Sequence, residues 1–395
     1  MVNFIYSTPT KIIFGKDGEN QVGELIKGIG AKKVLVHYGG GSVIASGLLD
    51  RVKKSLDASN ISYTEQGGVV PNPRLTKVRE GIKIAQEENV DFILAVGGGS
   101  VIDSAKAIGT GALYDGDVWD FFSGKSVPSK TIPVGCILTI AAAGSEMSAA
   151  SVITNDELDT WQKKSYNSEI SKCIFSILNP ELTYTLPAYQ SACGGVDIVM
   201  HTLERYFSPI GGMDITDGIA HAVIKTMLEN MPKVLEDLTN YEAQSEIMWA
   251  GSISHNGITG CGGISDWSTH QLEHELSAKY DVAHGAGLSA LWGSFARYVY
   301  LENPIRFKNI GINVFNINKE LSDEAGALMT IEKMEEYFTS IKMPISIKEL
   351  GLNLNEEDLI ELADNCSINR SRTIGSFKPL NRDDMLEIYK MANKK

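Results

Sequence analysis

The sequence predicts an α/β part with a parallel sheet, followed by an all-helical part. In the first half, short β-branched runs alternate with helical stretches, which is typical of parallel strands joined by crossover helices. After Pro187 there are long amphipathic stretches and few candidate strands. We therefore expect two domains, residues 1–187 and residues 188–395, divided where the proline interrupts the pattern.

The elements can be assigned in chain order. Strands are expected at 33–38, 91–96 and 131–140, where apolar runs are bounded by glycine or polar residues. Helices of the first half are expected at 43–57 and about 101–112, with another opening at Gly144-Ser145-Glu146. In the second half, helical spacing of apolar residues predicts helices at 213–231, 241–256 and 325–341.

Composition excludes several classes of protein. The 395 residues are 43% hydrophobic and 22% charged, which is globular, and the net charge of −13 disfavours nucleic acid and anionic membranes as partners. The longest apolar runs are too short to span a bilayer at about 20 residues, and the N-terminus lacks a secretory pattern. Five widely spaced cysteines without a Cys-x-x-Cys indicate reduced thiols and a cytoplasmic location.

Two glycine-rich turns follow the first two predicted strands. Residues 39–42 and 97–100 both read Gly-Gly-Gly-Ser, and each precedes a helical stretch. Glycines let the backbone approach a diphosphate, and a helix N-terminus offers free N–H groups. One such turn could serve geometry alone. Two of them, at the strand ends where doubly wound sheets bind nucleotides, favour a Rossmann-like dinucleotide-binding domain over residues 1–187.

The first turn bears on which nucleotide binds. An acidic residue near a strand end commonly contacts the ribose hydroxyls of NAD and repels a 2′-phosphate. Residues 39–42 contain no acid, and Ser42 carries a hydroxyl that can hydrogen-bond a phosphate. On the assumption that the 2′ position lies at this turn, the sequence favours NADP over NAD.

Six of the seven histidines lie between residues 201 and 284. Asp197 and His201 are four residues apart, as are His270 and His274, so each pair shares one helix face, and His284 follows ten residues later. One carboxylate and several imidazoles suit Zn²⁺ or Fe²⁺. A buried histidine is more often a core residue than a ligand, yet two pairs and a third element favour a metal site. Spacing alone does not show which of these histidines would bind the metal, or whether the metal is zinc or iron. Core or surface roles are expected for His37, His221 and His255.

The layout resembles the iron-containing alcohol dehydrogenase family over nearly the whole chain. The histidine intervals of four and ten residues are the most specific match, and residues 38–42 resemble the NADPH-dependent butanol dehydrogenase and aldehyde reductase branch. Other matching segments are Pro9-Thr10-Lys11-Ile12-Ile13-Phe14-Gly15, Pro71-Asn72-Pro73, Gly97-Gly98-Gly99-Ser100-Val101-Ile102-Asp103-Ser104-Ala105-Lys106, Gly144-Ser145-Glu146-Met147 and Asn179-Pro180-Glu181-Leu182-Thr183.

This resemblance implies a role for each matching residue. The metal ligands would be Asp197, His201, His270 and His284. His274 would stand beside the nicotinamide as the catalytic residue and would not coordinate. The cofactor would be bound by Gly40 and Ser42 at the 2′-phosphate, by Gly98, Gly99 and Ser100 at the diphosphate, and further by Asn72, Asp103, Thr139 and Lys163. We choose Lys163 over Lys164 because its interval to Pro180 fits better.

The chain departs from the family pattern at a few positions. The usual Thr-Leu-Pro-Ala-Thr-Gly-Ser-Glu stands here without its proline and second threonine, which are Ala141 and Ala143. Asn179 replaces a common aspartate, and Glu273 replaces a glycine before His274. These changes affect cofactor affinity and pocket shape and leave the implied ligand set intact.

The function that the resemblance implies is reversible hydride transfer between NADP(H) and primary alcohols such as butanol or the matching aldehydes. One divalent metal, Fe²⁺ or Zn²⁺, would act as a Lewis acid. The family branch also implies a homodimer.

Two alternatives remain. A dehydroquinate-synthase-like lyase would need several cations for a phosphorylated substrate, and residues 188–290 contain only Arg205, Lys225, Lys233 and Lys279. A non-catalytic nucleotide-binding protein is supported only by the two alanine changes.

Overall fold

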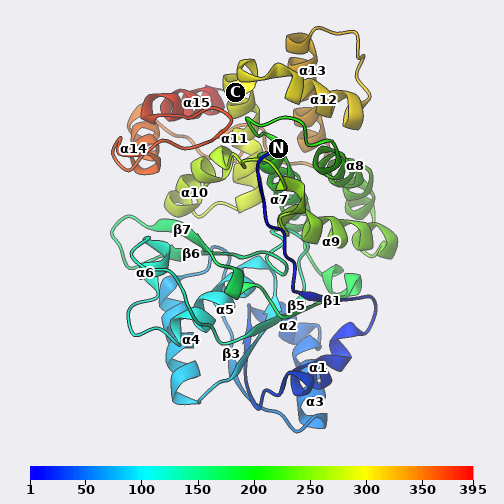
Figure 1. The fold of residues 1–395 in the computed structure, drawn as a ribbon, viewed down its shortest axis with the longest axis vertical. Coiled ribbons are helices and arrows are strands. Elements are labelled where there is room, and N and C mark those ends of the chain that lie inside the picture. Colours follow the sequence, from blue (N-terminus) through cyan, green and yellow to red (C-terminus); the bar gives the residue numbers. More distant parts are fainter. Residues whose placement is uncertain (395) are drawn as a thin grey trace. The chain divides into compact units, whose positions relative to one another are not determined.

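The computed structural model describes residues 1–394, which form two compact units (Figure 1). The sheet unit contains residues 7–187 and 238–252. The helical unit contains residues 1–6, 188–237 and the chain from residue 253 on. A parallel sheet with helices in the N-terminal part and a helical C-terminal part confirm the predicted fold class.

The sheet has six strands, and every pairing in it is parallel. Across the sheet the order is β1 (Lys11–Phe14), β8 (Phe175–Leu178), β5 (Val134–Leu138), β4 (Phe92–Gly97), β2 (Lys33–Tyr38) and β3 (Ser62–Gln66). The chain passes from β2 outward to β3 and then returns across β2 to β4. The strand order therefore reverses between β2 and β4, and the crevice outside the carboxyl ends of two such strands is where open α/β sheets bind ligands.

Both faces of the central strands are covered by helices. Val36 of β2 and Leu94 of β4 belong to one buried core with residues of α1 (Val22–Ile29) and α3 (Leu48–Ala58). Ile93 points to the other face, where it lies close to Gly109 of α5 (Gly99–Gly111). Helix α5 packs against α4 (Leu75–Glu87) and on β4. Burial on both faces explains the continuous apolar runs in these strands.

The helix predicted at 43–57 is two helices in the structure. A short α2 (Gly41–Ala45) is followed by α3, and Gly47 between them has a left-handed backbone with φ of 69°. The strands predicted at 33–38 and 91–96 are confirmed as β2 and β4, and the core of the third as β5. A one-turn helix, α6 (Trp119–Phe122), precedes β5.

The helix predicted to open at Gly144 does not form, because a buried lysine binds the carbonyls of this segment. Nζ of Lys106, on α5, donates to the carbonyl oxygens of Ser145 (2.7 Å), Ser148 (2.9 Å) and Ala150 (2.8 Å). Carbonyls that point at a buried ammonium group are not available for helical hydrogen bonds. The prediction was wrong because the deciding partner comes from another element.

A two-stranded antiparallel hairpin follows this turn. It consists of β6 (Ala150–Asn155) and β7 (Gln162–Asn167). The sequence did not predict it, since β7 reads Gln-Lys-Lys-Ser-Tyr-Asn and has no apolar alternation. The one buried residue of β7 is Tyr166, whose hydroxyl lies 3.0 Å from Oγ1 of Thr110 on α5.

Two segments lie in a different unit from the one that the sequence suggests. Residues 238–252, which include most of α9 (Tyr241–His255), belong to the sheet unit. Oγ of Ser252 donates to Oε1 of Glu146 (2.5 Å), and Nζ of Lys16 lies 4.7 Å from the ring centre of Tyr241. Residues 1–6 belong to the helical unit, where the N–H of Val2 donates to the carbonyl of Gly262 (2.8 Å).

The helical unit is organised around α11 (His284–Val299). This helix is buried along most of its length and packs against α7, α10, α13 and α15. The surrounding helices are α7 (Ala188–Tyr206), α8 (Asp214–Glu236), α10 (Ser268–Tyr280), α12 (Pro304–Phe315), α13 (Asp323–Ser340), α14 (Glu356–Cys366) and α15 (Arg382–Lys394). Helices α8, α9 and α13 confirm the three predicted in this half. Within residues 1–394, no helix is long and apolar enough to cross a membrane.

Candidate active site

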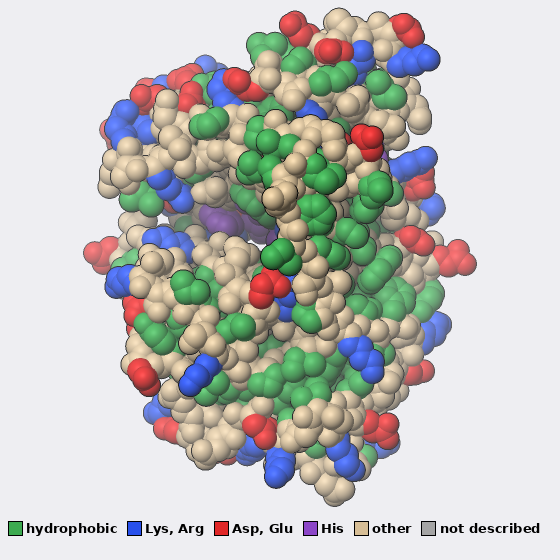
Figure 2. Space-filling view, viewed as in Figure 1, with side chains coloured by type: hydrophobic (Ala, Val, Ile, Leu, Met, Phe, Trp, Pro, Cys, Tyr) green, Lys and Arg blue, Asp and Glu red, His purple; other side chains and the backbone are tan. Residues whose placement is uncertain are grey.

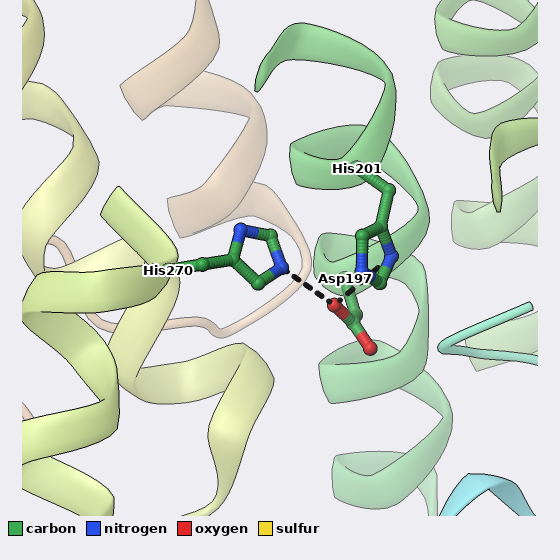
Figure 3. A group of neighbouring side chains, drawn as sticks. All are labelled: Asp197, His201 and His270. Carbon is green, nitrogen blue, oxygen red and sulfur yellow. Dashed lines mark ion pairs between the residues drawn. The ribbon is translucent and has the colours of Figure 1, made fainter. Parts of the chain in front are cut away.

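Three imidazoles in the helical unit converge on one carboxylate oxygen, Oδ1 of Asp197. His201 Nδ1 lies 3.3 Å from it, His270 Nε2 3.6 Å and His284 Nε2 3.8 Å. Figure 3 shows Asp197 and His201 one turn apart on α7, with His270 facing them from α10. Two ligand atoms, each about 2.1 Å from a tetrahedral ion, lie about 3.4 Å apart. The spacing therefore suits one shared cation.

The buried atoms of this cluster fit a divalent metal. Asp197 Oδ1, His201 Nδ1 and His270 Nε2 are buried and have no hydrogen-bond partner among the residues that the structure describes. A buried polar group without a partner costs about 1–3 kcal/mol, so three such atoms within 4.8 Å of one another favour a bound cation. One carboxylate with imidazole nitrogens is a donor set for Fe²⁺ or Zn²⁺.

His270 is held by a second buried carboxylate. Its Nδ1–H donates to Oε2 of Glu204 (2.8 Å), and Oε1 of Glu204 accepts from the backbone N–H groups of Thr269 (2.6 Å) and His270 (3.1 Å). Because a carboxylate only accepts, Nδ1 carries a proton and Nε2 faces Asp197. Burial lowers the pKa of His270, but Glu204 and Asp197 outweigh it and raise the pKa to about 9. This electrostatic field favours a cation, and a metal would displace the proton from Nε2.

The pKa of His201 is shifted in the opposite direction from that of His270. Burial, and then the neighbouring His255 and His270, hold the pKa of His201 well below its usual value, so the imidazole is neutral as a ligand must be. The rings of His201 and His255 are 4.1 Å apart. Arg205 donates from Nη1 to the carbonyl of His201 (3.0 Å) and from Nη2 to Nδ1 of His255 (3.0 Å). His255 thus packs beside a candidate ligand, and the sequence offered no sign of this.

His284 is the first residue of α11, and a third carboxylate binds it. Its Nδ1–H donates to Oε2 of Glu273, which comes from α10 and is fully buried. The ring of the neighbouring His274 lies 5.7 Å from that of His284 and 6.5 Å from that of His270. Histidine side chains are visible at the surface in Figure 2, and the His284 side chain itself is 25% exposed. The cluster is therefore open to solvent on the side of His284.

Sequence reasoning missed both glutamates that bind the candidate ligands. Glu204 lies seven residues after Asp197 and three after His201, so its helix face was a usable signal. Glu273 was noticed only as a departure from a glycine. Its partner His284 lies on the next helix, and spacing alone does not reveal such a contact.

In the sheet unit, the two glycine turns lie side by side at the strand-order reversal. Residues 39–42 follow β2 and residues 98–100 follow β4, which pair with each other. A Cβ at Gly39 would lie 3.7 Å from Val101 Cγ2, whereas one at Gly40 or Gly41 would have nothing within 4 Å. Ser42 is exposed, and the backbone N–H of Thr139 donates to the carbonyl of Gly97 (3.1 Å).

Asp103 connects this region to the turn after β5. Its carboxylate accepts from the hydroxyl of Ser145 and the backbone N–H of Val152 (3.1 Å). Burial raises the pKa of Asp103 to about 6, against the opposing effects of Lys106, these hydrogen bonds and Lys163. Lys163 is thus close enough to act on Asp103, whereas Nζ of Lys164 lies 5.9 Å from the ring centre of Trp119.

Asn72 is the remaining residue that the sequence singled out for the cofactor. It lies in the segment before α4, is buried and has a left-handed backbone with φ of 52°. Its carbonyl accepts from Nη1 of Arg74 (2.8 Å). The guanidinium of Arg74 in turn lies 4.4 Å from the ring centre of Trp161.

Two family models match the chain. The iron-containing alcohol dehydrogenase model covers residues 9–180, and the C-terminal model of the Fe-containing alcohol dehydrogenase family covers residues 191–393. The chain belongs to the iron-containing alcohol dehydrogenase family. For a member of this family, a nicotinamide cofactor and Fe²⁺ or a similar divalent metal are implied.

Relatives in the iron-containing alcohol dehydrogenase family match over nearly the whole chain. The chain is 41% identical to the NADH-dependent butanol dehydrogenase A of Clostridium acetobutylicum, over 99% of this chain and 100% of that protein. It is 34% identical to the NADPH-dependent aldehyde reductase YqhD of Escherichia coli, over 93% and 97%. The crystal structure of NADH-dependent butanol dehydrogenase A from Thermotoga maritima superposes with a TM-score of 0.94, 38% identity and coverage of 99% and 98%.

Helices α7 and α11 pack closely beside His284, and this contact leads to a prediction about the stability of the protein. A Cβ at Gly285 would overlap the carbonyl of Cys193, so α7 and α11 approach each other closely beside His284. Gly285→Ala should push the two helices apart and destabilise the protein by about 2 kcal/mol or more. The matched control is Gly218→Ala, because Gly218 on α8 has open space and alanine is the better helix former. Denaturant unfolding measures both, and equal stability of the two variants would contradict the prediction.

Proposed function

We propose that the chain is an NADP(H)-linked, metal-dependent alcohol dehydrogenase and aldehyde reductase that acts on primary alcohols such as butanol and on the matching aldehydes. The observation that carries the proposal is the convergence of Asp197, His201 and His270 through buried atoms that lack partners, with His284 completing the set. The names of the relatives, butanol dehydrogenases and an aldehyde reductase, support the substrate class.

The metal would be held by Asp197, His201, His270 and His284, and when bound it withdraws electron density from the substrate oxygen as a Lewis acid. Glu204 keeps the proton of His270 on Nδ1, so that Nε2 is available. The carboxylate of Asp197 is buried, so its charge is little screened by bulk water.

The nicotinamide supplies or accepts the hydride. In this proposal Gly98, Gly99 and Ser100 bind the diphosphate, Gly40 and Ser42 the 2′-phosphate, and Asn72, Asp103, Thr139 and Lys163 complete the cofactor site. His274 exchanges the alcohol proton with solvent, because an imidazole can take up and release a proton near neutral pH.

The preference for NADP is supported by the turn after β2. Residues 39–42 present no acid to repel a 2′-phosphate, and Ser42 offers an exposed hydroxyl. The acidic Glu65 on β3 has its Oε1 in a salt bridge with Nζ of Lys53 (2.8 Å), which neutralises it. Relatives named for NADH and for NADPH are both similar to this chain, so a direct measurement is needed.

An aspartate at this turn should change the preference for the cofactor. Gly40 has an extended backbone with φ of −84° and no atom within 4 Å of an added Cβ, so Gly40→Asp fits without strain. Repulsion of the 2′-phosphate should lower kcat/KM for NADPH by roughly 100-fold and spare NADH. Gly28→Asp, on the open surface of α1, is the control and should change neither value. Parallel losses with both cofactors would argue against this role of the turn.

The proposed activity is tested by NADPH oxidation with a series of linear aldehydes, using protein loaded with Fe²⁺ or Zn²⁺. We expect turnover that peaks with short aldehydes such as butanal, and none with a phosphorylated acid. Tight NADPH binding without turnover of any aldehyde at full metal occupancy would contradict the proposed activity.

Two further properties belong to this proposal. We propose that the enzyme is a homodimer, which light scattering tests. We also expect it to work in the cytoplasm, where its five free cysteines stay reduced.

A further inference from the structure

We propose that Glu273 is a positioning residue of the metal centre, which holds His284 in its ligating orientation and strengthens metal binding. This inference rests on the proposed ligand set. Glu273 directly precedes His274 on α10, at a position where the sequence resemblance implied a glycine.

Both carboxylate oxygens of Glu273 have a defined partner. Oε2 accepts from Nδ1–H of His284, and Oε1 accepts from the hydroxyl of Ser277, one turn further along α10. The side chain of Glu273 is fully buried, so neither contact is shared with bulk water. Because the carboxylate only accepts, it keeps the proton of His284 on Nδ1 and directs the lone pair of Nε2 toward Asp197.

The neighbouring helix leaves room for this carboxylate. A Cβ at Gly287, on α11, would lie 2.8 Å from both Cγ and Oε1 of Glu273. Glycine at this position of α11 therefore creates the space that Glu273 fills. Glu273 and Gly287 together connect α10 to the first turn of α11, where His284 lies.

His284 needs such a support more than the other candidate ligands do. It begins its helix and its side chain is 25% exposed, whereas those of Asp197 and His201 are almost fully buried on α7. His270 has the same kind of support from Glu204. Two of the three imidazoles are thus backed by a carboxylate, which raises the basicity of a ligand and restricts its ring.

Buried carboxylates surround the candidate metal position. Those of Asp197, Glu204 and Glu273 belong to the cluster, and each can compensate part of the charge of a bound cation. Removing Glu273 would take one of these carboxylates away from the site, so the ion should bind more weakly.

The test is a titration of metal-free protein with Co²⁺, read from the visible absorption of the bound ion in competition with a chelator. Glu273→Ala should bind Co²⁺ about 10–100-fold more weakly than the wild type and change the shape of the absorption band. Glu273→Gln, which keeps one acceptor oxygen and the volume, should fall between the two. Glu335→Ala is the matched control, because it removes a buried carboxylate of α13 that binds Arg297 outside the cluster.

The outcomes separate this inference from the proposed ligand set. Equal affinity of the wild type and both Glu273 variants, when His284→Ala binds weakly, would overturn the role of Glu273 alone. Equal loss in Glu335→Ala would also overturn it, since the effect would then be one of general stability. Wild-type protein that binds no Co²⁺, or His284→Ala that binds as the wild type does, would overturn the ligand set itself.

Discussion

The His270→Ala variant is expected to lose its metal and to reduce butanal at least about 1,000-fold more slowly than the wild type. Loss of the imidazole removes a donor whose Nε2 lies 3.6 Å from Asp197 Oδ1, and it leaves the carboxylate of Glu204 without its imidazole partner. Polarisation of the substrate oxygen is worth several kcal/mol, and about 4 kcal/mol corresponds to a thousandfold change in rate. Elemental analysis and NADPH oxidation measure the two effects on the same preparation.

The control for this variant is His221→Ala, another histidine of the helical unit. His221 packs beside Tyr206, with ring centres 5.3 Å apart, and takes no part in the cluster. It should keep both metal and rate. If His270→Ala retains its metal and its activity, the ligand set is wrong. NADPH should still bind to His270→Ala, because none of the glycine turns is altered.

The Gly98→Val variant is expected to lose NADPH binding and to keep metal binding. A Cβ at Gly98 would lie 2.9 Å from Cδ1 of Ile140 and about as close to its Cβ, so valine would displace the turn after β5 as well as block the approach of the diphosphate. We expect the dissociation constant of NADPH to rise at least about 100-fold, the loss of two or more charge-assisted hydrogen bonds. Binding of Co²⁺ should stay at the wild-type value.

Fluorescence titration with NADPH measures the cofactor affinity of Gly98→Val, and the cobalt titration shows whether the variant is folded. Gly28→Val, on the surface of α1, is the control for a valine in place of a glycine that has open space around it. Unchanged NADPH affinity in Gly98→Val would contradict the assignment of this turn. Loss of cobalt binding as well would mean that the substitution disrupts more than the cofactor turn.

Much of the sheet could be predicted because its signals are local. Strands β2 and β4 are continuous apolar runs that end at glycine turns, and burial on both faces leaves no other pattern for them. The hairpin of β6 and β7 and the turn at Gly144 could not be predicted in this way. Their conformations depend on α5, which supplies Lys106 and Thr110 from more than thirty residues away in the chain.

The candidate site could likewise be predicted only in part from the sequence. The pairs Asp197 with His201 and His270 with His274 were visible as one-turn intervals on helices. The hydrogen bonds that orient the ligands were not visible. Glu204 shares a helix face with Asp197, but its partner His270 lies 66 residues away in the chain. Glu273 meets His284 across the junction of two helices. Residue spacing reveals side chains that share one face of a helix. It does not reveal a carboxylate that binds the second ring nitrogen of a ligand histidine from a different helix.

The most direct test of the account is reconstitution of metal-free protein with Fe²⁺ or Zn²⁺ while NADPH oxidation by butanal is followed. We predict that the rate rises in proportion to added metal, saturates at one ion per chain, and does not rise in His270→Ala. Metal-free protein that reduces butanal as fast as the reconstituted protein would contradict it.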